Sequence, residues 1–275
     1  MLILETLKAL LIGIVQGITE WLPISSTGHM LLLNELFPLS VSQEFFELFT
    51  VVIQLGSIMA VAVRFFNRLN PFSQDKTKQK QALSLWYKVA LASIPVVLVG
   101  YFFDDKLSEL LYTNGNVAAT IIAISLIVYG VAFILVEHLK KTPPVSEGVS
   151  AKKAFLIGCF ESLAVIPGTS RSGSTILGAR LLGETRTAAT EFSFFLAIPA
   201  MLGASALKVV KFVSSGISMS GEEGIILAVG CLSAFFVSLA VIGFLTDFVK
   251  KHSFVPFGIY RILLGVAVIL WMVLK

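Results

Sequence analysis

Long apolar segments are the feature that most constrains the fold of this chain. Six of them have about the 20 residues that a helix needs to cross the hydrocarbon core of a bilayer. They cover residues 44–66, 85–103, 117–139, 188–210, 224–248 and 254–274. Charged residues make up 14% of the chain, against about 25% in soluble domains. Since a helix pairs its own backbone polar groups, these segments predict transmembrane helices.

Two further apolar stretches are each interrupted by a polar turn. The first covers residues 2–37 and is interrupted between Glu20 and His29, and the second covers residues 154–182 and is interrupted between Pro167 and Thr175. Irregular backbone at membrane depth requires protein or water around it, so each stretch predicts a re-entrant hairpin of two short helices.

Basic residues in the connecting segments predict the orientation. Residues 64–80, 138–153 and 250–251 are rich in Lys and Arg, which favours the cytoplasmic side for all three. Six alternating spans satisfy this condition, and they place the first hairpin on the outer side, the second on the inner side and both termini outside. Asp104, Asp105 and Glu109 predict an acidic loop after the second span.

The two hairpins align with one another when the first is shifted by about 145 positions. Gly13 then meets Gly158, Gln16 meets Glu161, Ser25 meets Ser170 and Gly28 meets Gly173. We therefore predict an all-α integral membrane protein with six transmembrane helices and two re-entrant helical hairpins in an inverted-topology repeat. Residues 1–275 form a single membrane domain, with one repeat at about 1–139 and the other at about 151–275. In such folds the tips of broken helices meet near the membrane midplane and form one site.

The second turn, Pro167 to Thr175, has the chemistry of an oxyanion site. Arg171 needs a polar cavity and a partner inside the membrane, and its fork of donors suits phosphate. The glycines of this turn let the backbone approach a ligand closely, and amides at the start of a helix attract anions. A simpler interpretation is a Gly- and Ser-rich turn with one interfacial Arg.

The first turn adds groups that phosphoryl transfer can use. Gln16 and Glu20 share one helix face, which leads to Ser25, Ser26, Thr27 and His29. With Arg171, they give a candidate nucleophile, a base and an anion clamp, and phosphoryl transfer depends mostly on positioning and charge stabilisation.

Each of these residues has a structural alternative. Ser26 or Thr27 can cap a helix, His29 can lie at an interface, and Glu20 can form a structural ion pair with Arg171. Gln54 can cross-link helices. Glu47 and Glu191 each begin a span, where a carboxylate favours the helix dipole, so we expect a structural role for both.

The motifs of the chain resemble those of the undecaprenyl-diphosphate phosphatase, or bacitracin-resistance, family. The resemblance rests on five segments that run nearly end to end: residues 16–20, 22–29, 52–57, 167–175 and 191–193. It implies hydrolysis of undecaprenyl diphosphate to the monophosphate at the outer face of the bacterial plasma (inner) membrane by a multi-pass protein. That reaction recycles the lipid carrier for cell-wall synthesis and lowers sensitivity to bacitracin.

The resemblance also implies roles for individual residues. Those of the catalytic core are Glu20, Ser26, His29 and Arg171. Those expected to bind substrate are Gln16, Ser25, Thr27, Gly168, Ser170, Ser172 and Thr175. A divalent cation, Mg²⁺ or Ca²⁺, is a candidate cofactor with Glu20 as candidate ligand. The family has Glu or Gln at the position of Gln16, so the amide here puts in doubt a cation site built from two carboxylates of this helix.

The expected partners are a polyprenyl diphosphate lipid and the membrane, with a homodimer as a candidate assembly. The net charge of +4 does not indicate nucleic acid, because the basic residues lie mostly in short loops that set topology. A flippase or anion transporter is the main alternative, since inverted repeats with broken helices are typical of transporters. An acid-phosphatase-like lipid phosphatase would need a His-x3-Asp motif, which the sequence lacks. The residues leave open the metal requirement, the choice between Ser26 and water as nucleophile, and the preferred chain length.

Overall fold

A computed structural model describes residues 2–112, 115–139 and 148–274, and every regular element in these ranges is a helix. The side chains of residues 27, 31, 35, 103–112, 115 and 116 lie outside this description. The elements are α1 (Leu2–Thr19), α2 (Ser26–Leu36), α3 (Gln43–Arg64), α4 (Phe66–Leu69), α5 (Lys76–Tyr112), α6 (Gly115–Leu139), α7 (Ala151–Ser162), the 3-10 helix η1 (Leu163–Val165), α8 (Arg171–Leu181), α9 (Arg186–Ser214), α10 (Gly221–Lys251) and α11 (Val255–Leu274).

Within the described ranges, 7 helices are long and apolar enough to cross a membrane. They are α1, α3, α5 through Phe102, α6 from Val117, α9, α10 and α11. The prediction of an all-α, multi-pass membrane protein is confirmed, and each of the six predicted spans corresponds to one of these helices. The seventh is α1, which with 18 residues has the length of a span although we predict it to be half of a hairpin. The division into six spans and two re-entrant hairpins therefore stays a prediction.

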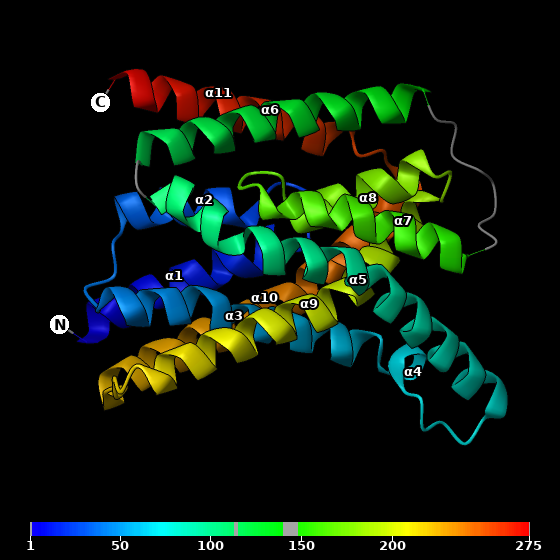
Figure 1. The fold of residues 1–275 in the computed structure, drawn as a ribbon, viewed down its shortest axis with the longest axis horizontal. Coiled ribbons are helices and arrows are strands. Elements are labelled where there is room, and N and C mark those ends of the chain that lie inside the picture. The colour runs from blue at the N-terminus through cyan, green and yellow to red at the C-terminus, as the bar shows by residue number, and fades with distance from the viewer. Residues whose placement is uncertain (1, 113–114, 140–147, 275) are drawn as a thin grey trace.

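The helices form three layers, and the two hairpins lie in the middle one. In Figure 1, α6 and α11 lie side by side along one edge, α3, α9 and α10 lie along the other, and the hairpins occupy the middle. The hairpin of α1 and α2 extends from the end of the molecule that holds the N-terminus, and the hairpin of α7 and α8 extends from the opposite end (Figure 1). Their turns meet in the interior, where the Ser172 hydroxyl donates to the Leu22 carbonyl at 3.2 Å.

Both hairpins contain the same unusual turn. Ser25 precedes α2 with a φ of 73°, and Ser170 precedes α8 with a φ of 70°, a left-handed conformation that is rare for residues other than glycine. The Ser25 hydroxyl accepts from the Gly28 amide at 3.3 Å, and the Ser170 hydroxyl accepts from the Gly173 amide at 3.1 Å. The serine and glycine pairs that align in sequence therefore have the same capping geometry.

A glycine lets the first helix of each hairpin lie directly against a long helix of the other half of the chain. A Cβ atom at Gly13 of α1 would collide with the Gly230 carbonyl of α10, and one at Gly158 of α7 would collide with the Ala92 carbonyl of α5. Small residues allow such close approach of helix backbones in membranes. Each hairpin thus packs against the half of the chain to which it does not belong, which holds the two turns at a common depth.

Two connecting segments differ from their predicted form. The prediction of a loop at Asp104, Asp105 and Glu109 is wrong, because α5 continues as helix to Tyr112. The polar segment before the second span is also largely helical, since α5 begins at Lys76. Charge alone does not end a helix, because Lys, Glu, Gln and Leu all favour helical backbone. Residues 140–147, where the sequence predicts a Pro-containing basic loop, lie outside the described residues.

The glycine contacts make a testable prediction about stability. Gly158→Ala should lower the melting temperature of the detergent-purified protein by several degrees, because overpacking costs about 1–3 kcal/mol and each kcal/mol shifts the melting temperature by about 2–4 °C. Gly203→Ala in α9 is the matched control, since a Cβ atom there meets nothing within 4 Å. The control should melt at the same or a higher temperature. Equal melting of the two variants would contradict the packing described for α7.

Candidate active site

An ion pair joins the two hairpin turns. Arg171 is the first residue of α8, and its Nη2 donates to Glu20 Oε1 at 3.2 Å, while its Nη1 donates to the Ser193 carbonyl of α9 at 3.1 Å. Both side chains are largely buried, with 14% of Arg171 and 6% of Glu20 exposed. A guanidinium has five N–H donors, so Arg171 keeps donors for a ligand after these two bonds.

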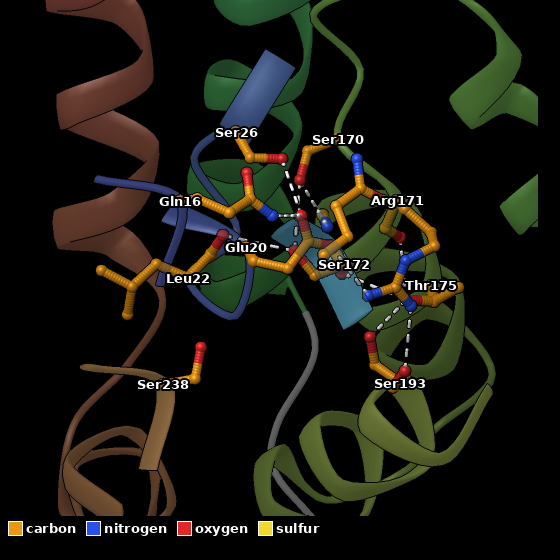
Figure 2. A network of polar contacts seen from close by, with 12 residues as sticks. Gln16, Glu20, Leu22, Ser26, Ser170, Arg171, Ser172, Thr175, Ser193 and Ser238 are labelled. Atoms are coloured by element: carbon orange, nitrogen blue, oxygen red, sulfur yellow. Dashed lines mark hydrogen bonds and ion pairs between the residues drawn. The ribbon is translucent and has the colours of Figure 1, made fainter. Parts of the chain in front are cut away.

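Glu20 is the centre of a polar network that Figure 2 shows. Its second oxygen, Oε2, accepts from Gln16 Nε2 at 2.9 Å and from the Ser26 hydroxyl at 2.9 Å. Ser26 is the first residue of α2, and the residue that caps this helix is Ser25. The alternative in which Ser26 caps the helix is therefore wrong, and its hydroxyl is oriented by a carboxylate instead.

His29 lies on α2 one turn beyond Ser25. Its Nδ1 lies 2.7 Å from the Ser25 carbonyl oxygen, and its Nε2 lies 2.6 Å from the Tyr260 hydroxyl of α11. The two rings stack with centroids 5.7 Å apart. Among the hydrogen bonds of the described residues, none joins His29 to Ser26, Glu20 or Arg171.

Two further predicted residues, Ser172 and Thr175, hold the turns in place. Ser172 donates to the Leu22 carbonyl and lies 3.2 Å from the Ser170 hydroxyl, and Thr175 lies 2.7 Å from the Ser193 hydroxyl. These bonds hold α8 against the first turn and against α9. The side chain of Thr27, also predicted to bind substrate, lies outside the described residues.

A cavity of about 260 Å³ lies where the two turns meet. Groups from both hairpins and from three other helices line it, and part of its wall is apolar. The lining residues are Glu20, Ser26, Gln54, Val96, Glu161, Ala164, Val165, Ile166, Pro167, Gly168, Ser170, Arg171, Ala200, Met201 and Ala204. Of the predicted catalytic residues, the cavity brings together Glu20, Ser26 and Arg171. His29, Gln16, Ser25, Ser172 and Thr175 are not among the residues that line it.

Sequence reasoning missed two buried charged residues of the site. Arg261 of α11 has none of its surface exposed (0%) and donates to the carbonyls of Pro23 at 3.1 Å, Gly168 at 2.8 Å and Thr169 at 2.9 Å. It thereby joins the backbones of both turns. Glu161 of α7 is also 0% exposed and lines the cavity. A single charge in the otherwise apolar sequence of α11 is the signal that could have identified Arg261, and the alignment with Gln16 is the signal for Glu161.

Glu47 and Glu191 have the structural role that we expected from their places in the sequence. Glu47 of α3 pairs with Lys208 of α9, and Glu191 of α9 pairs with Arg68 of α4 at 2.6 Å. Neither carboxylate lines the cavity between the turns. Gln54 donates within its own helix to the Thr50 carbonyl at 3.4 Å and faces the cavity, so it does not cross-link helices through this bond.

Comparison with known proteins identifies one family. A family model described as bacitracin resistance protein BacA matches residues 9–267. An undecaprenyl-diphosphatase of Acetivibrio thermocellus is 52% identical over 274 residues, which cover 98% of each chain. Undecaprenyl-diphosphatase 1 of Clostridioides difficile is 51% identical over 97% of this chain and 96% of the relative. An undecaprenyl-diphosphatase of Streptococcus agalactiae serotype V is 51% identical over 99% of each chain.

The contacts of Arg261 predict that it stabilises the joined turns. Arg261→Leu leaves three buried carbonyls without this donor, and each unsatisfied group costs about 1–3 kcal/mol. We expect a melting temperature in detergent lower by well over 5 °C, since each kcal/mol is worth about 2–4 °C. Arg64→Leu, at the exposed end of α3, is the control and should melt like the unaltered protein. Loss of the same size in both variants would mean that the carbonyl contacts contribute nothing specific.

Proposed function

This chain belongs to the bacitracin resistance protein BacA family, and from this membership we propose that it hydrolyses undecaprenyl diphosphate to undecaprenyl phosphate and inorganic phosphate. Three relatives about half identical over nearly their full length are named for that activity. The observation that supports the proposal in the structure is the cavity in which Ser26, Glu20 and Arg171 meet. The names describe a phosphatase and not a transporter, which favours the enzyme over the flippase.

Arg171 and the turn around it are suited to hold the diphosphate. The guanidinium offers donors in the geometry that phosphate oxygens accept. Gly168 and Ser170 line the same cavity, and α8 begins directly after Ser170, so its first amides lie beside the ligand. A positive group fixed in a site that excludes bulk water stabilises the charge that shifts during phosphoryl transfer.

We propose Ser26 as the nucleophile and Glu20 as its base. Because the Ser26 hydroxyl already donates to Glu20 at 2.9 Å, Glu20 is placed to take the proton as the oxygen attacks the terminal phosphorus. The bond from that phosphorus to the bridging oxygen breaks, and undecaprenyl phosphate leaves. Water then attacks the phosphoserine, releases inorganic phosphate and regenerates the Ser26 hydroxyl. His29 contacts Ser25 and Tyr260, so we assign it to positioning the first turn of α2.

A divalent cation, Mg²⁺ or Ca²⁺, fits the donor set of the cavity. Among the described residues no group of three or more His, Cys, Asp or Glu could hold an ion by itself. Mg²⁺, however, is commonly bound through one or two carboxylates together with substrate phosphates, and Glu20 lines this cavity. When bound, such an ion would supply positive charge next to the diphosphate.

The apolar part of the cavity wall is suited to the lipid. Val96, Ile166, Ala200, Met201 and Ala204 lie beside the polar groups, so a diphosphate at Arg171 can leave its hydrocarbon tail among the helices. We propose that α1 with α2 and α7 with α8 are re-entrant, that six helices span the bacterial plasma membrane, and that the site faces outside. A homodimer stays a proposal that this site does not require.

Removing the guanidinium of Arg171 should strongly reduce turnover. Arg171→Ala is expected to lower phosphate release from undecaprenyl diphosphate by at least about 100-fold, the loss typical of removing one group that stabilises transition-state charge. The assay uses protein purified in detergent, where a transporter would have no compartments to connect. Arg68→Ala, which breaks the ion pair to Glu191 away from the cavity, is the control and should retain activity. Full turnover by Arg171→Ala would refute the assignment.

The nucleophile and base should behave as one unit. Ser26→Ala and Glu20→Gln are each expected to lower kcat by about 10²–10⁴-fold, as for other removed acid–base groups. The double variant should be hardly slower than either single variant, because groups that act together are not additive. His29→Gln should lose less, since the described contacts of His29 are to Ser25 and Tyr260. Additive losses at Ser26 and Glu20, or a His29 variant as slow as Ser26→Ala, would count against this pairing.

A further inference from the structure

Glu161 is a buried carboxylate that no contact in the described structure explains. It lies in the last turn of α7, it is 0% exposed, and both carboxylate oxygens have no hydrogen-bond partner among the described residues. A buried charge without a partner is strongly unfavourable, and buried carboxylates are therefore normally paired or bound to a metal ion. Glu161 lines the cavity between the turns, so the partner can come from a ligand.

The place of Glu161 in the hairpin strengthens this interpretation. It aligns with Gln16, whose amide donates to Glu20 in the first hairpin. The first hairpin thus has an amide at this position and the second has a carboxylate. Glu20 and Glu161, one from each hairpin, are the two acidic side chains among the residues that line the cavity.

The two carboxylates that line the cavity share one cation of its lining, Arg171, which attracts Glu161 without a hydrogen bond to it. Arg171 forms its ion pair with Glu20, which leaves Glu161 without a contacting cation. A phosphate group that enters adds a further charge of about −1.5 to −2 at neutral pH. Arg171 is the one cation among the described residues that line the cavity, and the buried Arg261 donates to backbone carbonyls, so a divalent cation would offset the repulsion between the diphosphate and the two carboxylates.

We propose that Glu161 is a ligand for a divalent cation of the Mg²⁺ type, which it holds together with Glu20 across the meeting point of the two hairpins. The diphosphate oxygens and water supply the other ligands, and Gln54 also lines the cavity. This inference rests on the proposed function for its substrate, but the binding of the cation itself does not. The amide of Gln16 puts in doubt a cation site with two carboxylates on its helix. In this proposal the second carboxylate is instead Glu161, which belongs to the opposite hairpin.

Mn²⁺ binding to the detergent-purified full chain tests the proposal without any turnover. Mn²⁺ replaces Mg²⁺, and the free ion is counted by its paramagnetic resonance signal, with and without methylenediphosphonate as an unhydrolysable diphosphate. Glu161→Gln should weaken Mn²⁺ binding at least tenfold, and Glu161→Asp should retain part of it. Glu191→Gln is the matched control, because this carboxylate belongs to a surface ion pair outside the cavity, and it should bind Mn²⁺ like the unaltered protein. Unchanged Mn²⁺ binding by Glu161→Gln overturns the proposal.

A second measurement on the unaltered protein covers the case in which the variant does not fold. An apolar carbodiimide modifies buried carboxyl groups, and mass spectrometry locates the modified residue. Mn²⁺ should protect Glu161 from modification, and equal labelling with and without Mn²⁺ overturns the proposal. If the protein binds Mn²⁺ through Glu161 but releases no phosphate from undecaprenyl diphosphate, the proposed function fails and the cation site stands. If phosphate is released while Glu161→Gln leaves Mn²⁺ binding unchanged, the cation site fails and the proposed function stands.

Discussion

The buried ion pair between Arg171 and Glu20 is the contact on which the rest of the structure depends. Arg171, the first residue of α8, is largely buried in an apolar chain, and a guanidinium in such a place requires a partner close by. The partner belongs to the other hairpin, at 3.2 Å. Both hairpins must therefore turn inside the protein where these two side chains meet, and they reach this point from opposite ends of the molecule (Figure 1).

Turns at that depth expose backbone carbonyls that water would satisfy in a soluble protein. Here Arg261 donates to three of them, and Ser172 donates to a fourth at Leu22. A second buried guanidinium is thus the consequence of placing irregular backbone in an apolar setting, where unpaired polar groups cost several kcal/mol. Arg261 and Ser172, which pair the carbonyls of the turns, do not line the cavity, whereas Glu20, Ser26 and Arg171 do.

Local rules predicted much of this arrangement from the sequence. Hydropathy located the six long apolar helices and both interrupted stretches, and the cost of a lone Arg in an apolar chain predicted a partner for Arg171, with Glu20 as a candidate. The serine and glycine register predicted equivalent turns, and Ser25 and Ser170 have nearly equal positive φ angles and the same cap. Contacts between distant segments could not be read in this way. The carbonyl partners of Arg261, the position of Glu161 in the cavity and the contact of His29 with Tyr260 arise from packing of α11 and α7, for which the sequence has no local pattern.

The similarity of the two turns makes their differences informative. With the register of Ser25 and Ser170, the first residue of α2 is Ser26 and the first residue of α8 is Arg171, so equivalent backbone positions carry the hydroxyl and the guanidinium. Glu20 corresponds in the same register to Val165, and Gln16 corresponds to Glu161. The caps, which fix the backbone, are the same in both hairpins, whereas the side chains that face the cavity differ. A diphosphate ester is itself asymmetric, since its terminal phosphorus is attacked and its bridging oxygen leaves. In the proposed mechanism one turn supplies the hydroxyl that attacks the diphosphate and the other supplies the guanidinium that holds it, so different side chains on the same backbone match the asymmetry of the substrate.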